Sequence, residues 1–598
     1  MTPQQLGKRY VIVDERLSPL TGTSRFDPEG ESTPTARHDV DGRRPSTGRP
    51  VRTPLDQATS ATVHGDATEH VRAADLTLDK FIDAATLASA NGLAEPTEPV
   101  RTVLITGASG YLGRFLCLEW LRRLAPRGGT VLCLVRGDDV EQARARLSAA
   151  FDGAPELAEE FGALAERALQ VLPGDVGSSR LGLDERAWLR LADEVDLIVH
   201  AAARVSHVLP YESLFAPNVF GTAEVIRLAL TARRKPVAFL SSVAVVHSHF
   251  TPAPEDADIR AVNSTRTVGG RYGNGYSATK WAGEVLLREA HERFGLSAIV
   301  FRSGMVLAHR EQAGQINSAD VFTRLFLSIV LTGVAPRSFY PNPGRAPQYD
   351  GLPVDFTAAA VASLSERNRR GFATFNVVNP HRSDPSLDTF VDGLVDGGRP
   401  LRRLDHYRDW LTHVTASLRA RPQHVQRQSL LPVLDAFDDP TLVATPDPLP
   451  ADRFHAEVRA SELGDVPHVD VSFLRKHIDD LVPAAGEPGR AAEKDLPRPT
   501  VRRPSGDTDV LGVVRGALRY FQDCQRPDGS IVEHGEEHHY LRFWDTVNVL
   551  RAVIAWREVV EPPMGLVEGG LACLRAAEKA HGLVRWGDTE IGDDRYCA

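Results

Sequence analysis

Short apolar runs alternate with longer stretches of helical spacing between residues 100 and 310. Residues 103–105 and 131–135 are apolar runs bounded by polar residues, as is typical of strands buried on both faces of a parallel sheet. Between them, large apolar residues recur at helical spacing over residues 115–124, and Gly128 and Gly129 end the run. This pattern predicts a strand, a helix and a second, parallel strand.

The same alternation continues along the chain. Further apolar runs predict strands at residues 169–175, 195–203, 236–242 and 297–304. Amphipathic stretches between them predict helices at residues 145–151, 218–230 and 276–288. This order is typical of the α/β class with a doubly wound parallel sheet, in which ligands bind outside the carboxyl ends of the strands. The motifs described below all follow such strand ends.

Three glycines follow the first predicted strand at once, in the GxxGxxG pattern of Gly107, Gly110 and Gly113. Glycine at such a turn permits a tight bend, close approach of a pyrophosphate, and close packing of the helix whose N-terminus faces the phosphates. Without the flanking strand and helix, these glycines would indicate an ordinary turn about as readily as a cofactor site. With them, the pattern resembles that of short-chain dehydrogenase/reductases and predicts a dinucleotide site formed by Thr106, Gly107, Ser109, Gly110, Tyr111, Leu112 and Gly113.

The residue after the second strand indicates which dinucleotide is bound. A carboxylate there would bind the ribose 2′-hydroxyl of NAD, whereas the guanidinium of Arg136 suits the 2′-phosphate of NADPH. Asp138 and Asp139 follow closely and weaken this inference, and the alternative is a solvated loop arginine. Asp175 is placed equally well for the adenine edge and for a turn. The other predicted cofactor contacts are Arg146, Ala201, Ala202 and Ala203.

Tyr276 and Lys280 form a Tyr-x-x-x-Lys pair that opens a predicted helix, so both side chains lie on one face. A tyrosine with a pKa of about 10 is a poor proton shuttle at pH 7, and a cation one turn away makes its phenolate accessible. Ser242 ends the preceding strand and is placed to donate to a substrate carbonyl as negative charge builds there. Each feature alone has a simpler explanation, a solvated pair or a turn cap. Together they predict Ser242, Tyr276 and Lys280 as catalytic residues, with Lys280 also holding the nicotinamide ribose.

Composition narrows the range of partners. Apolar residues make up 42% and charged residues 25% of the 598 residues, as in ordinary soluble globular proteins. A net charge of −10 without a basic stripe argues against nucleic acid as a partner. The five cysteines are scattered without CxxC spacing, which predicts reduced thiols and no metal site. Because no signal peptide and no apolar run of about 18 residues occur, we expect a cytoplasmic protein without a membrane span.

The remaining regions are less regular. Residues 1–70 are rich in Pro, Gly, Ser and Arg and predict a disordered arm, and a short amphipathic helix is expected at residues 75–91. The sequence predicts an NADP-binding domain at residues 71–310 and a substrate lobe at residues 311–483 that includes a strand at residues 374–379. A Pro- and Gly-rich linker at residues 484–508 and a helical segment at residues 509–598 follow.

Several stretches together resemble the terminal reductase domain of carboxylic acid reductases and related thioester reductases. The likeness covers about residues 60–482 and is carried by TGASGYLGR, CLVRG, LPGDV, LIVHAAARVSHVLPY, PNVFGTAEVIRLAL, FLSSVAV, NGYSATKWAGEVLLREA, VFRSGMVLAHR and YDGLPVDF. It implies the extended short-chain dehydrogenase/reductase fold, NADPH, and reduction of a phosphopantetheine-bound acyl thioester to an aldehyde. The family's catalytic threonine or serine, its tyrosine and its lysine correspond to Ser242, Tyr276 and Lys280.

The adenylation and carrier domains that precede this reductase in the resembled enzymes do not occur in this sequence. We therefore expect the acyl group to arrive as a thioester on a separate phosphopantetheinyl carrier protein or on CoA. Two other functions stay open. One is an extended short-chain dehydrogenase/reductase that acts as a nucleotide-sugar epimerase or dehydratase, and the other is a non-catalytic interaction protein.

The C-terminal segment carries a second resemblance. Arg515, Gly516, Tyr520, Gln525 and Gly529 match the QW repeat of squalene-hopene cyclases, prenyltransferases and related α/α toroids, although isoleucine stands where tryptophan is usual. Such repeats are structural, and no DxDD acid motif occurs. Residues 509–598 are too few to close a toroid, so we expect a truncated toroid or a binding remnant.

Overall fold

The computed structural model describes residues 58–65, 69–96, 99–246, 253–268, 273–317, 320–340, 351–381, 386–396, 398–437 and 449–485, with single residues and one helix between 518 and 581. One compact unit runs from Ser46 to Ala491, so the division of the chain falls inside the predicted linker at residues 484–508. In the described part of the chain, no helix combines the length and apolar character needed to cross a membrane.

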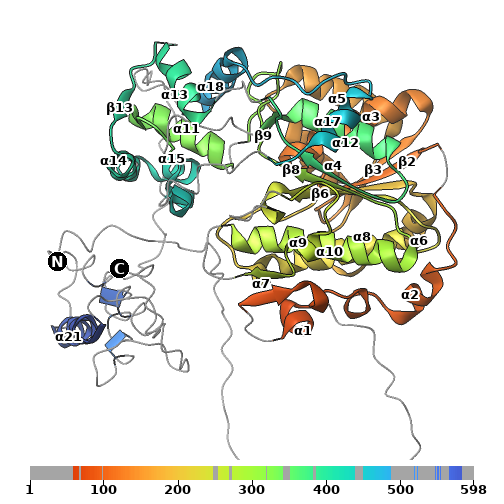
Figure 1. Ribbon diagram of the computed structural model, residues 1–598, viewed down its shortest axis with the longest axis horizontal. Coiled ribbons are helices and arrows are strands. Elements are labelled where there is room, and N and C mark those ends of the chain that lie inside the picture. Colours follow the sequence, from red (N-terminus) through yellow and green to blue (C-terminus); the bar gives the residue numbers. More distant parts are fainter. Residues whose placement is uncertain are drawn as a thin grey trace, which may run out of the picture. The chain divides into compact units, whose positions relative to one another are not determined.

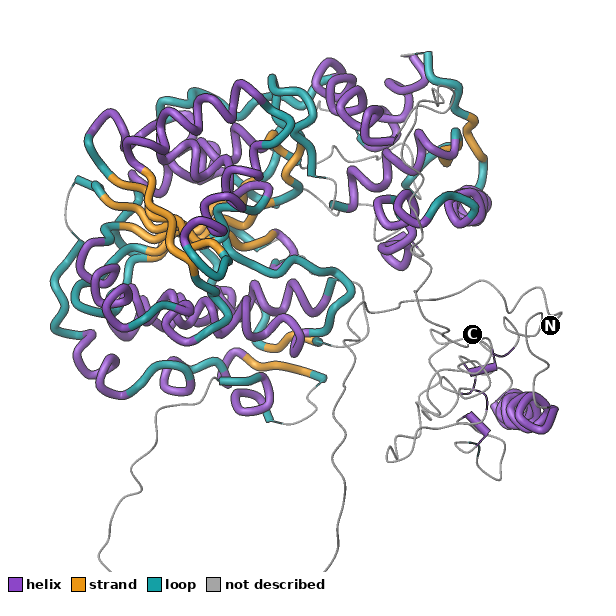
Figure 2. Tube along the Cα trace, turned by 180° about the vertical axis from the view of Figure 1, so that it is seen from behind, coloured by secondary structure: helices purple, strands orange, loops and turns teal. Residues whose placement is uncertain are grey.

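A seven-stranded parallel sheet forms the centre of this unit (Figures 1 and 2). Its strands are β2 (Thr102–Thr106), β3 (Thr130–Val135), β4 (Leu169–Pro173), β5 (Leu197–His200), β6 (Val237–Ser242), β8 (Ala298–Ser303) and β12 (Phe372–Val377). The strand order is β12-β8-β6-β5-β2-β3-β4, so successive strands are added on one side of β2 up to β4 and on its other side from β5 onward. The position between β2 and β5 is the switch point where a doubly wound sheet binds its ligand. The predicted α/β fold class is therefore confirmed.

Helices cover both faces of the sheet, which is why its central strands are buried along almost their whole length (Figure 1). One layer contains α3 (Tyr111–Leu124), α4 (Val140–Ser148), α5 (Pro155–Ala168), α12 (Val354–Arg367) and α17 (Asp452–Arg459). The other contains α6 (Glu185–Glu194), α7 (Tyr211–Phe215), α8 (Gly221–Ala229), α9 (Ile259–Val262) and α10 (Asn274–Phe294). Trp120 of α3 and Trp281 of α10 are fully buried in one continuous apolar core.

Strand β12 corrects the predicted boundary between the NADP-binding domain and the substrate lobe. The sequence pattern places residues 374–379 in the lobe of residues 311–483, but this run forms the edge strand of the main sheet, paired with β8. Phe454 and Val458 of α17 belong to the same core. The nucleotide-binding domain therefore also includes elements from beyond residue 310. Strand β12 pairs with β8, helix α12 packs against α3, and α17 packs against β12 and α12.

A second, smaller apolar core forms the lobe. Its residues come from α11 (Val321–Thr332), α13 (Leu387–Asp396), α14 (Tyr407–Arg419), α18 (Val471–Ala485), the short parallel strands β10 (Val334–Pro336) and β13 (Arg402–Leu404), and the segments that connect them. Helix α15 (Gln423–Gln428) lies in the same lobe and buries none of its residues. The ring centroid of Phe322 lies 4.6 Å from that of Phe326 and 5.0 Å from that of Phe390. A two-residue parallel pair, β9 (Val306–Leu307) and β11 (Leu352–Pro353), lies where the chain leaves the main sheet and returns to it.

The N-terminal segment is ordered earlier than the sequence suggested. Helix α1 (Ser60–His64) and strand β1 (His70–Arg72) lie partly within the predicted arm at residues 1–70, and β1 pairs antiparallel with β7 (Thr265–Thr267). The helix expected at residues 75–91 is reduced to α2 (Ala84–Ala90), preceded by two short 3-10 turns. Helix α2 begins where the Asp83 carboxylate accepts a hydrogen bond from the Thr86 amide at 2.8 Å. Residues 1–57 of the predicted arm lie outside the described residues.

In the C-terminal segment, the structure describes α21 (Met564–His581) and a small apolar cluster of Leu518, Val553 and Leu566. The Gln525 side-chain amide donates to the Leu566 carbonyl at 3.1 Å. The other residues of the QW-like motif, Arg515, Gly516, Tyr520 and Gly529, lie outside the described residues. The described cysteines Cys117 and Cys133 are free thiols buried in the main core, as the sequence predicted, and Cys573 is also buried.

Candidate active site

The glycine-rich turn lies at the switch point, between the end of β2 and the end of β5. Gly107 has a φ of 76°, and a Cβ atom there would lie 2.6 Å from the Cα of Ala202, which follows β5. A Cβ atom on Gly113, in the first turn of α3, would lie 1.9 Å from the Gly107 carbonyl oxygen. Both distances are far below van der Waals contact, so the three backbones approach this closely only with glycine at both positions.

Thr106 uses its hydroxyl inside the protein. Its Oγ1 lies 2.7 Å from His200 Nδ1 and accepts a hydrogen bond from the Ala202 amide at 3.3 Å. The Thr222 hydroxyl lies 3.1 Å from His200 Nε2 and donates to the Asn218 carbonyl at 2.6 Å, so His200 Nε2 carries the donated proton. Burial lowers the pKa of His200 to about 3, and the nearby Lys280 charge acts in the same direction. A neutral histidine therefore joins β2 to β5 below the turn.

The N-terminus of α3 fits a pyrophosphate. Gly110 is its N-cap residue and supplies no side chain, so no side-chain oxygen caps the first amides of this 14-residue helix. Ser109 is half-buried beside it. Tyr111 Oη lies 2.8 Å from the Leu307 carbonyl and 3.0 Å from the Gln315 carbonyl, and Leu112 packs against the main core. Tyr111 and Leu112 are therefore available to a dinucleotide through their backbone amides rather than their side chains.

The predicted adenosine contacts follow two neighbouring strand ends. Val135 pairs with Pro173, which places Arg136 and Asp175 after adjacent strands. Arg136 is exposed and forms no ion pair with the described residues. Strand β4 ends at Pro173, two residues earlier than predicted, and the Asp175 carboxylate accepts from the Gly177 amide at 2.9 Å, as the turn alternative requires.

The two carboxylates after Arg136 differ in what they contact. Asp139 caps α4 by accepting a hydrogen bond from the Gln142 amide at 2.8 Å, so its carboxylate already has a structural role. Asp138 is exposed, as is Arg146 in the last turn of α4. Of the two acidic residues that compete with the NADPH interpretation, one is thus accounted for by the helix.

Ser242 ends β6 and begins a 3-10 turn over Val243–Val245. Its Oγ accepts a hydrogen bond from the Ala244 amide at 3.2 Å, which is the turn cap that the sequence left open as an alternative. A hydroxyl that accepts a hydrogen bond still has its proton to donate. The turn therefore orients Ser242 without consuming its ability to bind a carbonyl oxygen.

Tyr276 and Lys280 lie in the first two turns of α10, and burial shifts both pKa values. Burial lowers the pKa of Lys280 to about 7, opposed by the charge of Glu284, and raises the pKa of Tyr276 to about 12. Lys280 Nζ donates to the Leu240 carbonyl at 2.6 Å and lies 4.8 Å from the centre of the Phe239 ring. A raised pKa keeps Tyr276 a neutral phenol at neutral pH, so its hydroxyl is able to donate a hydrogen bond.

Asn218 was not predicted as a site residue, although it lies in the PNVFGT stretch. It sits in a π-helical turn, Ala216–Phe220, that joins α7 to α8. Its amide donates to the Arg204 carbonyl at 3.2 Å and to Thr279 Oγ1 at 3.0 Å, and its carbonyl accepts from the Arg204 amide at 2.7 Å. Asn218 thus ties the loop after β5 to α10 between Tyr276 and Lys280. A buried asparagine in an apolar helix was the sequence signal for it.

A buried ion pair lies one helical turn beyond Lys280. Arg302 of β8 contacts the Glu284 carboxylate at 2.8 Å, with side chains 1% and 2% exposed, and Ser241 Oγ donates to Glu284 at 2.5 Å. Removing one partner of such a pair leaves an unpaired buried charge, which costs about 3–5 kcal/mol. The pair therefore links α10 to β6 and β8 beneath the catalytic candidates.

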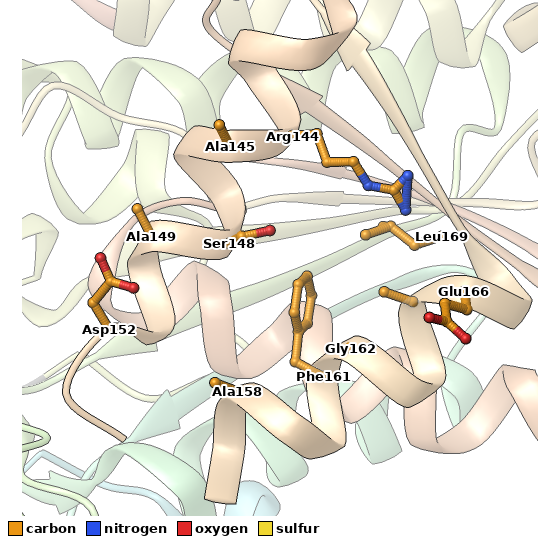
Figure 3. Close-up of a pocket in the computed structure, with 11 residues that line it drawn as sticks. Arg144, Ala145, Ser148, Ala149, Asp152, Ala158, Phe161, Gly162, Glu166 and Leu169 are labelled. Carbon is orange, nitrogen blue, oxygen red and sulfur yellow. The ribbon is translucent and has the colours of Figure 1, made fainter. Parts of the chain in front are cut away.

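A hollow of about 920 Å³ lies between α4 and α5 (Figure 3). Its lining includes Arg144, Phe161 and Gly162, and Arg144 extends across it toward Leu169 at the start of β4. None of its lining residues is among the predicted catalytic or cofactor-binding residues. The hollow is therefore separate from the site at the carboxyl ends of the strands.

The fold and these residues define an NAD(P)-dependent oxidoreductase of the extended short-chain dehydrogenase/reductase type. Residues 105–361 match the family described as "Male sterility protein". The chain is 49% identical over 435 residues to a carboxylic acid reductase of Segniliparus rugosus, covering 71% of this chain and 37% of that protein. It is 47% identical over 462 residues to the isonitrile lipopeptide synthase of Mycobacterium tuberculosis, covering 73% of this chain and 18% of that protein.

A solved reductase domain of a nonribosomal peptide synthetase from Mycobacterium tuberculosis is 46% identical, with a TM-score of 0.64. The match covers 69% of this chain and 98% of that domain. The chain therefore belongs to the family of reductase domains that carboxylic acid reductases and nonribosomal peptide synthetases share. The comparisons do not support the squalene-hopene-like resemblance of residues 509–598.

Substituting alanine for Gly113 tests the close approach at the switch point. Gly113→Ala should lower the stability of the unit by about 1–3 kcal/mol, because the new methyl group overlaps the Gly107 carbonyl. Gly162→Ala is the matched control, since its methyl group meets no atom within 4 Å in α5 and should stabilise the helix by about 0.5–1 kcal/mol. Urea unfolding measures both. Equal effects of the two substitutions would contradict the steric argument.

Removing the Tyr276 hydroxyl tests its role as a donor. Tyr276→Phe should lower turnover by about two to four orders of magnitude while cofactor affinity stays unchanged, because only stabilisation of the transition state is lost. Tyr407→Phe, which removes a hydrogen bond to the Phe437 carbonyl in the lobe, should keep its turnover within a few-fold. Steady-state kinetics and cofactor titration give both numbers. Full turnover in Tyr276→Phe would mean that another group holds the carbonyl oxygen.

Proposed function

We propose that this chain uses NADPH to reduce a carrier-bound or CoA-bound acyl thioester to an aldehyde. The observation that supports this most directly is the placement of Ser242, Tyr276 and Lys280 around the end of β6, beside the dinucleotide turn at the switch point. The relatives add to it, since they are named as carboxylic acid reductases and as reductase domains of peptide synthetases. The chain spans 37% of the length of the carboxylic acid reductase.

The residues supply hydrogen bonds and a proton to the substrate carbonyl. NADPH, when bound, supplies the hydride. Ser242 Oγ and Tyr276 Oη donate to the thioester oxygen as negative charge builds on it, and a pKa of about 12 keeps Tyr276 protonated at neutral pH for this purpose. Proton transfer to the oxygen gives a hemithioacetal, whose collapse releases the aldehyde and the free thiol of the carrier.

Lys280 is held in a defined position by the Leu240 carbonyl. Burial lowers its pKa to about 7, against the attraction of Glu284. An anionic cofactor nearby favours the charged form. We assign Lys280 to the nicotinamide ribose and to electrostatic support of the oxygen that Tyr276 contacts.

The acyl donor is a thioester for a chemical reason. A carboxylate opposes hydride attack through its charge and resonance, whereas a thioester carbonyl accepts a hydride. A carrier protein adds contacts remote from the reacting carbon, and such binding energy is available to orient the thioester. We therefore expect carrier-bound acyl groups to be reduced faster than the corresponding acyl-CoA.

Cofactor preference tests the assignment of Arg136. Arg136→Ala should weaken NADPH binding by about 1.5–3 kcal/mol, the magnitude of a charged hydrogen bond, and leave NADH binding nearly unchanged. Arg144→Ala is the control, because Arg144 lies on α4 and lines the separate hollow (Figure 3). Fluorescence titration of both cofactors measures the change. Equal weakening of NADPH and NADH in Arg136→Ala would remove the assignment.

The substrate class is tested with NADPH oxidation by the full chain. We expect oxidation with acyl thioesters on carrier protein and on CoA, and none with the same free acids, because only the thioesters have an electrophilic carbonyl. Protein purified with bound NAD that ignores every thioester would instead support the epimerase or dehydratase alternative. Failure to bind either cofactor would support a non-catalytic interaction protein.

A further inference from the structure

The segment that precedes α10 contacts both elements that carry the catalytic candidates. Arg266 is the middle residue of β7. Its Nη2 donates to the Ala244 carbonyl at 3.1 Å and to Ser277 Oγ at 2.9 Å, and its Nη1 lies 3.3 Å from the Val245 carbonyl. Ala244 and Val245 belong to the turn after Ser242, and Ser277 directly follows Tyr276. One guanidinium therefore bridges the two catalytic elements.

Asn263, three residues earlier, makes a parallel connection. Its side-chain amide donates to the Val245 carbonyl at 2.9 Å, and its backbone carbonyl accepts from the indole Nε1 of Trp281 at 2.9 Å. Trp281 directly follows Lys280 in α10. The segment from Asn263 to Arg266 is thus hydrogen-bonded to the turn after Ser242 and to the residues next to Tyr276 and Lys280.

The guanidinium of Arg266 is not explained by an ion pair. In the described part of the chain no carboxylate lies within ion-pair distance of it. Burial lowers the pKa of Arg266, and the more distant charge of Glu284 raises it by less. A partly buried cation without an anionic partner is costly. The planar fork of an arginine, however, reaches several acceptors at fixed angles, which the single ammonium of a lysine does not.

The backbone of Arg266 is held from its other side. It pairs with Val71 in the antiparallel β1–β7 ribbon, and Val71 is buried. The Ser264 carbonyl accepts from the Ala73 amide at 2.9 Å next to this ribbon. The N-terminal segment therefore anchors the strand from which Arg266 reaches the two catalytic elements.

We propose that Arg266 is a positioning residue, which sets the separation between the hydroxyls of Ser242 and Tyr276 by bridging the turn after β6 to the first turn of α10. This inference rests on the proposed function, because both hydroxyls act on one carbonyl oxygen. A displacement of about 1 Å between such groups lowers turnover by about 100-fold without removing any of them.

Arg266→Lys tests the proposal in the full chain, with Arg260→Lys as the matched control. Arg260 lies on α9 and pairs with Asp258 and Glu292 at the surface, so its replacement should leave turnover unchanged. Arg266→Lys should lower kcat by about 10- to 100-fold, with KM for the thioester and NADPH affinity within twofold of wild type. Ser277→Ala removes the α10 partner of Arg266, together with the hydrogen bond from Ser277 Oγ to the Asn274 carbonyl at 3.1 Å, and should show a smaller fall in kcat with the same pattern.

Amide hydrogen exchange measures whether Arg266 holds the turn after β6 and the first turns of α10 together, independently of activity. In Arg266→Lys and in Ser277→Ala, amide exchange should rise in residues 242–246 and 274–281 and stay unchanged in β2 and β3, whereas Arg260→Lys should change neither segment. Either of two results overturns the proposal. One is an unchanged kcat in a folded Arg266→Lys protein, and the other is unchanged amide exchange in residues 242–246 and 274–281 in both Arg266→Lys and Ser277→Ala. If wild-type protein reduces no thioester, the proposed function fails, and the exchange result alone decides whether Arg266 bridges the two elements.

Discussion

The contact on which the rest of this structure depends is the backbone approach at the switch point. Gly107 lies against Ala202, and Gly113 lies against the Gly107 carbonyl, at distances that leave no room for a side chain on either glycine. This contact brings the start of α3 directly over the ends of β2 and β5. The uncapped amides of α3 therefore lie at the edge where the sheet reverses its order, and the other ligand-facing strand ends are placed relative to them.

Burial controls the protonation of the groups around this edge. It lowers the pKa of His200 to about 3 and of Lys280 to about 7, and it raises the pKa of Tyr276 to about 12. His200 is thus neutral and serves as a hydrogen-bond link between strands, while Tyr276 keeps its proton. A site arranged in this way donates to an oxygen that gains negative charge, which is what reduction of a carbonyl requires.

Much of this arrangement was predictable because it is local in the sequence. Apolar runs marked the strands near Val103 and Val131, and the residue types after each strand marked the dinucleotide turn and the Ser242, Tyr276 and Lys280 set. The strand at residues 374–379 was also recognised, but its sheet was not, since pairing with β8 depends on a return of the chain across the lobe. The same holds for Arg266 and Asn218, whose partners lie 11 to 61 residues away along the chain.

Hydrophobic period, glycine spacing and residue type act over a few residues, so they were sufficient to predict the secondary structure of the nucleotide-binding core and the chemistry available at its strand ends. The pKa shifts of Tyr276 and Lys280, the boundary of the lobe and the bridge made by Arg266 follow from the tertiary structure. Each of these depends on which sequence-distant groups exclude water from a side chain or accept its hydrogen bonds. Residue spacing along the chain does not indicate which sequence-distant groups surround a side chain.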